Sequence, residues 1–248
     1  MTQHDTIFNN AENPMPLAPE HMDLVTDVIS KLQDTVNLAT NDFLLVAAFL
    51  KNINDRSKLI HSIILETQVS NIVTELQYID ALKQRIDHMV FFLEEISELK
   101  HPALYSNEMI NTYHKTCGLI FQLNFYQLKV TKADFVKSVE KIKSGLTALK
   151  ARPGDGSPLE VEPKDIFNYF HKVIKNMHEV AQSFIHLSAV FPVNSEVRSL
   201  SIVRHLLNRY TMESEREVLR WCMNYLEDSS IGELKIDDLL KEEQIQLF

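Results

Sequence analysis

Glycine is scarce in this sequence: it accounts for 5 of the 248 residues, whereas average usage would give about 17. Folds rich in tight turns and β-bulges need residues that tolerate positive φ, so this scarcity disfavours a sheet-rich fold. The patterns G-x-G-x-x-G and G-x-x-x-x-G-K-[ST] are also absent. The chain therefore lacks the glycine-rich loops that hold phosphates in nucleotide-binding folds.

Cysteine and basic clusters are missing as well. The two cysteines, Cys117 and Cys222, are too few for a disulfide framework and form no C-x-x-C pair. Acidic residues outnumber basic ones by 34 to 25, which gives a net charge of −9. Without clustered Lys and Arg to bind phosphates, the chain is a poor candidate for binding nucleic acid or anionic membranes.

Long hydrophobic runs are absent too. The longest, 43–50, is far shorter than the about 20 residues that a membrane span needs. The first residues, 1–19, are polar and contain prolines, unlike a secretory signal peptide. These features predict a cytoplasmic protein without a membrane span.

The sequence does contain a long stretch that favours helix and has no residue that would break one. Neither proline nor glycine occurs from His21 to His101, which is rare outside helical proteins. A single helix of that length would reach roughly 120 Å. We therefore expect a turn at the polar residues 51–56, between helices over 19–51 and 57–100.

Further helices are predicted towards the C-terminus. One covers 103–150, with an interruption near Gly118 or Gly145. Another covers 163–190 and ends in a turn at 191–194, and a last one begins at Ser195 and continues to 228.

The predicted fold class is all-α: an elongated antiparallel bundle of four to five long helices, dimeric through them. Its expected parts are a disordered N-terminal arm (1–18), the long-helix bundle (19–150), a linker (151–163), a helical pair that packs on the bundle (164–228) and an acidic amphipathic tail (229–248).

The helix over 57–100 has the clearest periodicity. Apolar residues recur every three or four positions and predict a buried stripe: Ile72, Leu76, Ile79, Leu82, Ile86, Met89, Leu93 and Ile96. At about 100° per residue, a second set of side chains shares a face away from that stripe. We expect this face to be accessible to a partner; its members are Val73, Gln77, Asp80, Gln84, His88 and Phe91.

The segment LQYIDALKQR over residues 76–85 resembles the catalytic helix of CheZ-type phosphatases, which dephosphorylate CheY-like chemotaxis response regulators. The shared pattern is a Gln-rich lead-in followed by Asp-x-x-x-Gln on a long bundle helix. Here Gln77 matches the lead-in, and the pair is Asp80 and Gln84. The resemblance implies that Gln84 orients the attacking water and that Asp80 pairs with the regulator's active-site lysine.

Physical chemistry is consistent with these implied roles. Phosphoryl transfer depends mostly on positioning and charge stabilisation, so an amide can promote it without titrating. An i, i+4 spacing places both side chains on one helix face. We expect no cofactor of the protein's own, because the substrate regulator would bring the Mg²⁺.

The C-terminus carries a second resemblance to the same family. Its docking peptide for the regulator has Asp-Asp-Leu-Leu shortly before a terminal Phe. The corresponding residues here are Ile236, Asp237, Asp238, Leu239, Leu240 and Phe248. The alternative to a docking peptide is an acidic tail that packs on its own bundle.

Other interpretations remain open at this stage. The Asp80–Gln84 face could be a solvated stripe, or it could dock a response regulator without hydrolysing it. His88 could be the phospho-acceptor of a histidine phosphotransfer domain, although the Lys-Gly that usually follows such a histidine is missing. His171, His178 and His186 lie roughly on one helix face, but no carboxylates at i+3 or i+4 complete a metal-ligand set.

Overall fold

A computed structural model of the chain describes residues 17–57, 63–97, 106–150, 167–191, 193 and 201–225. Nearly all of these residues are helical and none of them forms a strand, so the predicted all-α class is confirmed for this part of the chain. The helices are α1 (Pro19–Ser57), α2 (Ile63–Leu76), α3 (Tyr78–Ser97), α4 (Asn107–Lys150), α6 (Phe170–Val190), α7 (Ser201–Arg209) and α8 (Glu213–Tyr225).

The chain divides into two compact units, Met1–Pro192 and Val193–Phe248. The first helix of the predicted helical pair, α6, packs on the long-helix bundle against both α1 and α4 and belongs to the first unit, whereas α7 and α8 belong to the second. The predicted linker over 151–163 lies outside the described residues.

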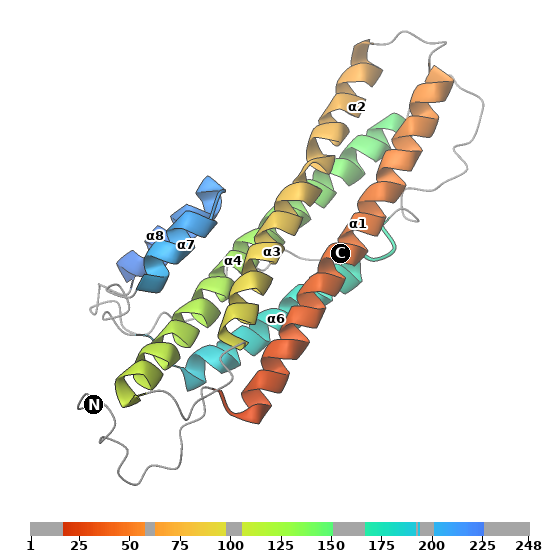
Figure 1. The fold of residues 1–248 in the computed structure, drawn as a ribbon. Coiled ribbons are helices and arrows are strands. Elements are labelled where there is room, and N and C mark those ends of the chain that lie inside the picture. The colour runs from red at the N-terminus through yellow and green to blue at the C-terminus, as the bar shows by residue number, and fades with distance from the viewer. Residues whose placement is uncertain are drawn as a thin grey trace. The chain divides into compact units, whose positions relative to one another are not determined.

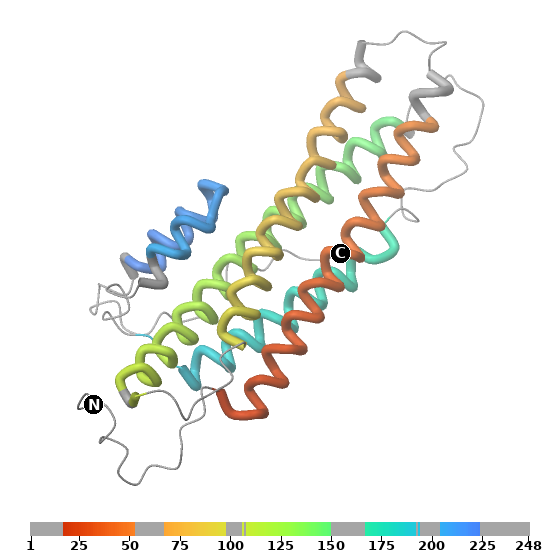
Figure 2. The backbone as a smooth tube through the Cα atoms, viewed as in Figure 1, coloured from red at the N-terminus to blue at the C-terminus, as the bar shows by residue number. Residues whose placement is uncertain are grey.

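In the first unit, α1 packs against α6 and α3, and α4 packs against α6, α2 and α3. Along the chain the helices alternate in direction: α1 rises in Figure 1, α2 and α3 descend, α4 rises and α6 descends. Figure 2 shows that the backbone passes from α2 into α3 without reversing. None of the helices in the described ranges is both long and apolar enough to cross a membrane.

The predicted stripe forms the buried side of α3. Its members Leu82, Ile86, Met89, Leu93 and Ile96 are all buried, whereas Leu76 and Ile79 are only half-buried. Three phenylalanine rings join the helices across the core: Phe43 of α1 stacks on Phe135 of α4 at 6.2 Å, and Phe135 stacks on Phe170 of α6 at 5.8 Å between ring centroids. The three-to-four-residue spacing of apolar side chains is therefore what brings these helices together.

The expected interruption of the helix over 103–150 is wrong, because α4 is continuous from Asn107 to Lys150. Its glycine at 145 permits close packing instead of a break. A Cβ built on Gly145 would lie 2.7 Å from Cγ1 of Ile72 in α2. A larger residue there would force the Ile72 side chain or the helix backbones to shift.

The turn expected at 51–56 is also wrong, since α1 continues to Ser57. The asparagines and aspartate of that stretch favour turns, but no proline or glycine forces the helix to end. The N-terminal arm was predicted to include Leu17, which is buried, and Ala18, whose carbonyl oxygen accepts hydrogen bonds from the first turn of α1. The rest of the arm, 1–16, lies outside the described residues.

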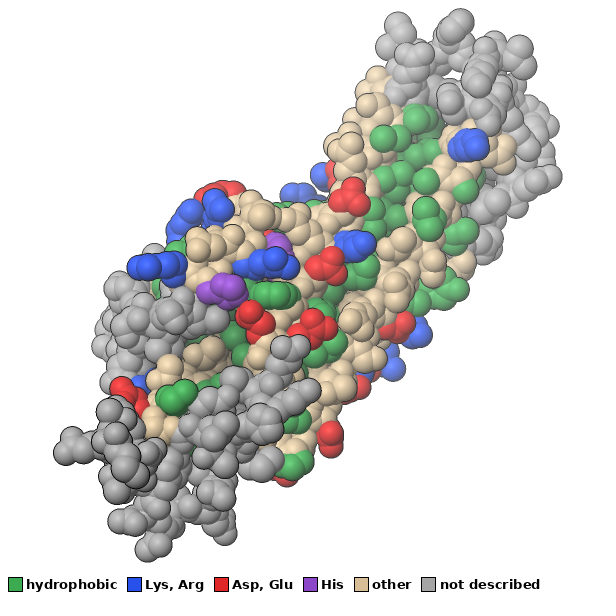
Figure 3. Space-filling view, in the orientation of Figure 1, with side chains coloured by type: hydrophobic (Ala, Val, Ile, Leu, Met, Phe, Trp, Pro, Cys, Tyr) green, Lys and Arg blue, Asp and Glu red, His purple; other side chains and the backbone are tan. Residues whose placement is uncertain are grey.

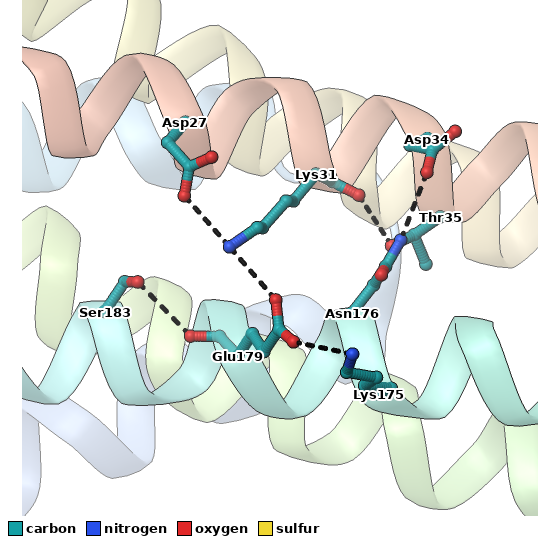
Figure 4. Close-up of polar contacts among 8 residues, drawn as sticks. All are labelled: Asp27, Lys31, Asp34, Thr35, Lys175, Asn176, Glu179 and Ser183. Atoms are coloured by element: carbon teal, nitrogen blue, oxygen red, sulfur yellow. Dashed lines mark hydrogen bonds and ion pairs between the residues drawn. The ribbon is translucent and has the colours of Figure 1, made fainter.

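Charged side chains join α1 to α6 along the surface (Figure 4). Lys31 Nζ lies 3.0 Å from Asp27 Oδ2 on its own helix and 3.0 Å from Glu179 Oε2 on α6. The hydrogen bond to Asp27, and then the one to Glu179, raises the pKa of Lys31. Further along, Asn176 Nδ2 donates to Asp34 Oδ2 at 3.4 Å.

The helix predicted over 163–190 begins later than expected, at Phe170, and ends as predicted before Phe191. The helix predicted from Ser195 to 228 is two helices, α7 and α8, separated by residues 210–212. At this break the buried Glu215 accepts a hydrogen bond from the Met212 N–H at 3.3 Å, and Arg216 Nε donates to the Tyr210 carbonyl at 2.8 Å. The first and last residues of that predicted helix lie outside the described ranges.

Candidate functional site

The segment that resembles the phosphatase helix spans a break between two helices. The helix predicted over 57–100 is interrupted at Gln77, which lies in a tight turn between α2 and α3. The Gln77 N–H donates to the Thr74 carbonyl at 3.3 Å, and the Asp80 N–H donates to the Gln77 carbonyl at 3.2 Å. These are i to i−3 hydrogen bonds, typical of a single 3₁₀ turn. Asp80 consequently lies in the first turn of α3.

Contacts with α4 explain a break that no proline or glycine signals. The Ser138 hydroxyl donates to the Glu75 carbonyl oxygen at 3.1 Å, and Lys141 Nζ lies 2.6 Å from Glu75 Oε1. A side chain that bonds to a helix carbonyl competes with the i→i−4 ladder at that point. The helix ends one residue later.

The start of α3 is anchored on the other side of the break. The Tyr78 hydroxyl donates to the Thr131 carbonyl at 2.8 Å, and burial raises the pKa of Tyr78. The buried Arg85 reaches Asp134 with 2.7 Å between Nη1 and Oδ2. Together these bonds fix both the rotation of α3 and its register on α4.

This anchoring leaves Asp80 and Gln84 on the outer side of α3. Asp80 is exposed and Gln84 is half-buried, one helical turn further on. Gln77 is exposed in the turn, and Val73 of α2 is 45% exposed. Of the predicted site residues, Val73, Gln77 and Asp80 are therefore exposed and Gln84 is partly so, and Asp80 and Gln84 share one uninterrupted helix.

Fewer residues of the predicted face are accessible than their angular positions around the helix suggest. His88 is only 7% exposed, which contradicts the expectation that it is accessible. Phe91 is half-buried and packs edge-on against Phe92, at 5.3 Å between ring centroids. A phospho-acceptor histidine needs an accessible imidazole, so the histidine phosphotransfer interpretation fails at this residue.

The C-terminal part of the predicted site stays a prediction. Its residues Ile236, Asp237, Asp238, Leu239, Leu240 and Phe248 lie outside the described residues.

The other candidate chemistries find little support in the described part of the chain. His171, His178 and His186 are all exposed on α6. Among the described residues, no group of three or more His, Cys, Asp and Glu side chains is arranged to hold a metal ion. Both cysteines are buried, and burial raises the pKa of each thiol to about 12, so neither is an activated nucleophile.

Sequence reasoning missed the residues that position this site. Ser138, Thr131 and Asp134 of α4 hold the break and the start of α3. Thr131 acts through its backbone carbonyl, which no residue type reveals. Arg85 and Tyr78 could have been suspected, because both are large polar residues within the segment that carries the resemblance.

Comparison with known proteins gives no relative: no family model matches the chain, and neither the curated proteins nor the solved structures include a match to it.

Proposed function

We propose that this protein is a CheZ-like phosphatase, which docks a phosphorylated receiver-domain response regulator and promotes hydrolysis of its aspartyl phosphate. The setting of Asp80 and Gln84 is the observation that supports it best. One is exposed and the other half-buried, one turn apart on α3, and the bonds of Tyr78 and Arg85 to α4 hold that helix in place. A rigid element is what a positioning catalyst needs.

In this proposal Gln84 acts on water. Its amide accepts a hydrogen bond from the water and donates one towards the phosphoryl oxygens, so that the water oxygen faces phosphorus in line with the leaving carboxylate. The new P–O bond forms as the bond to the aspartate oxygen breaks. The water proton leaves with inorganic phosphate, and the regulator's aspartate is restored.

Asp80 has a different proposed role. Its carboxylate pairs with the regulator's active-site lysine and orients the complex, while the regulator carries the Mg²⁺ that neutralises the phosphoryl charge. Val73 of α2 and Gln77 of the turn before α3 are both exposed, and in this proposal they add an apolar and a polar contact for the partner. The C-terminal residues 236–248 add a second docking segment by their resemblance to the family's peptide.

The test is phosphate release from a response regulator loaded with acyl phosphate in the presence of Mg²⁺. Gln84→Ala should lose on the order of 2–4 kcal/mol of rate acceleration, and circular dichroism of the variant checks that the helices are retained. A matched control is Gln182→Ala, an exposed glutamine on α6, which should keep the full rate. Asp80→Ala should instead raise the regulator concentration at half-maximal rate.

The alternative is a docking module without catalysis. If Gln84→Ala accelerates hydrolysis as well as the parent protein, the catalytic proposal fails and the Asp80–Gln84 face is a solvated or docking surface. Binding of the phosphorylated regulator by the parent protein, with no acceleration of phosphate release, would favour the docking module. Deleting 236–248 should weaken regulator binding in either case.

A further inference from the structure

The arginines of this chain are concentrated in one short stretch. Five of its eight arginines lie between residues 198 and 220, and no lysine occurs from residue 176 to residue 234. The described part of this stretch forms α7 and α8 of the second unit. In Figure 3, basic side chains and a histidine gather where Figure 1 draws these two helices. Arginine is well suited to binding carboxylates, because its planar guanidinium can donate two parallel hydrogen bonds.

The exposed surface of α7 is positively charged and has no carboxylate of its own. We call it the α7 surface and define it by five exposed residues: Arg204, His205, Leu207, Asn208 and Arg209. The helix SIVRHLLNR contains neither Asp nor Glu. In α8, by contrast, Arg220 Nη1 lies 2.7 Å from Glu213 Oε1, so that helix supplies a counter-charge itself. A positive surface on a chain of net charge −9 predicts an acidic binding partner.

The α7 surface also offers an apolar contact. Leu207 is 39% exposed, which places it among the exposed large hydrophobic side chains of the described residues. It follows Arg204 by three residues, so the two side chains are neighbours on the helix. An apolar and a basic side chain together fit a segment in which apolar and acidic residues are mixed.

Residues 229–248, the acidic tail, have that complementary composition. They contain five acidic residues against two lysines, and the run IDDLL over 236–240 places two carboxylates among apolar side chains. The ten residues 226–235 between α8 and this run reach at most about 35 Å, and α7 is only about 13 Å long. So short a tether gives the tail an effective concentration of the order of millimolar, and weak contacts then suffice for binding.

We propose that the acidic tail docks on the α7 surface of the same chain. Asp237 and Asp238 supply the charges that the α7 surface lacks, and the leucines beside them meet Leu207. The tail and α7 belong to the same compact unit, Val193–Phe248. Docking therefore uses the second unit and not the long-helix bundle.

This docking would regulate access to the regulator, a consequence that rests on the proposed function. The same residues, 236–248, are the segment proposed above to bind the phosphorylated regulator. A tail held on α7 is not available to the regulator, so the two contacts compete. Release of the tail should then strengthen regulator binding without changing the chemical step.

The first experiment is hydrogen–deuterium exchange of the full-length protein, followed by mass spectrometry. In the parent, backbone amides of 236–248 should exchange at least tenfold more slowly than those of a free synthetic peptide of the same sequence. Arg204→Glu/Asn208→Glu changes two exposed positions one turn apart, and it should return the tail to the rate of the peptide. Lys137→Glu/Ser144→Glu makes the same change in charge at exposed positions of α4, and it should keep the protection.

A charge swap separates docking from a loss of structure in α7. Asp237→Lys/Asp238→Lys leaves α7 untouched and should also release the tail. Combining it with Arg204→Glu/Asn208→Glu should restore protection, because opposite charges face each other again. Circular dichroism, and the emission of the single tryptophan in α8, check that each variant stays folded.

Three results would overturn the proposal. A parent tail that exchanges as fast as the free peptide is not docked. Protection that survives both Arg204→Glu/Asn208→Glu and Asp237→Lys/Asp238→Lys must come from another surface. Equal loss of protection in Lys137→Glu/Ser144→Glu would indicate a general effect of charge.

The second experiment tests the competition with a phosphorylated regulator. Arg204→Glu/Asn208→Glu should lower the regulator concentration at half-maximal rate at least threefold and leave the maximal rate unchanged. An unchanged concentration, in a variant whose tail is released, would refute the competition. A parent that does not accelerate phosphate release would contradict the proposed function instead, and hydrogen exchange would still decide whether the tail docks on α7.

Discussion

Asp42 shows how one residue can place the start of a helix that is distant in sequence. It is 1% exposed in the middle of α1, and both of its carboxylate oxygens lie 3.2 Å from the Tyr169 backbone nitrogen at the start of α6. The residue before α6 provides no side-chain cap of its own. Asp42 therefore acts as the N-cap of α6 from another helix, where its charge also complements the helix dipole.

Burial makes this carboxylate sensitive to pH. Desolvation raises the pKa of Asp42, although the backbone N–H groups of Tyr169 and its neighbours and the charge of Lys143 oppose that effect. A carboxyl whose pKa is higher in the folded state binds its proton more tightly there than in the unfolded chain. Its contribution to stability is therefore greatest at low pH and is lost as the pH rises through the raised folded-state pKa.

We predict that Asp42→Ala lowers the free energy of unfolding by about 0.5–2 kcal/mol, the usual effect of losing an N-cap. Asp42→Asn keeps an acceptor oxygen without the buried charge and should lose less at pH 7. When the pH is lowered from 7 towards the ordinary Asp value, the parent should gain stability relative to Asp42→Asn. Urea unfolding followed by circular dichroism at both pH values measures this difference.

The control for this prediction is Asp23→Ala, which removes an exposed carboxylate from the same helix. It should leave the unfolding free energy nearly unchanged. If Asp42→Ala proves equally neutral, the hydrogen bonds from Asp42 to the start of α6 contribute nothing to stability.

At the scale of elements, the break at Gln77 depends on side chains from α4. We predict that Ser138→Ala lowers the free energy of unfolding by about 1 kcal/mol, the net value of a typical hydrogen bond. Tyr78→Phe should lose a similar amount, since it removes only the hydroxyl that donates to the Thr131 carbonyl. Ser144→Ala, at an exposed position of the same helix, is the matched control for Ser138→Ala. All three are measured by urea unfolding.

One outcome would contradict the prediction for Ser138. We expect Ser138→Ala and Ser144→Ala to differ because Ser138 is buried and its hydroxyl donates a hydrogen bond. Equal unfolding free energies for the two variants would mean that the Ser138 hydroxyl does not stabilise the junction of α2 and α3.

The helices themselves could be predicted from the sequence, and many of their ends could not. The spacing of Leu82, Ile86 and Leu93 is a local property and predicts a buried face before anything is known of the neighbours. The start of α6 depends on Asp42, and the end of α2 depends on Ser138 of another helix. Such boundaries are decided by tertiary contacts, which residue preferences along the chain do not contain.

Part of the candidate site could likewise be predicted from the sequence, and part of it could not. The surface position of Asp80 and the partial exposure of Gln84 follow from their angle to the apolar stripe. The same angle wrongly places His88 on the surface, because the buried side of α3 is wider than its apolar stripe and includes the polar Arg85 as well. The angular position of a residue shows which way its side chain points, but it does not show how far the neighbouring helices extend around α3.

At the scale of the whole molecule, the two units contain different spectroscopic probes. The chain has a single tryptophan, and it lies in α8 of the second unit. The long helices α1, α4 and α6 belong to the first unit and dominate the helical signal of the described residues. Tryptophan fluorescence therefore reports on the second unit, and circular dichroism at 222 nm reports mainly on the first.

We predict that these two signals give different urea unfolding transitions. The described helices of the second unit are short, and a small core supplies little stability and a broad transition. Leu93→Ala, at a fully buried position in the first unit, should lower the stability seen by circular dichroism by about 2–5 kcal/mol. It should leave the fluorescence midpoint unchanged, whereas Leu219→Ala, at a buried position of α8, should shift the fluorescence transition alone. Coincident transitions that shift together in both variants would show one cooperative unit, because a two-state protein gives the same midpoint with every probe.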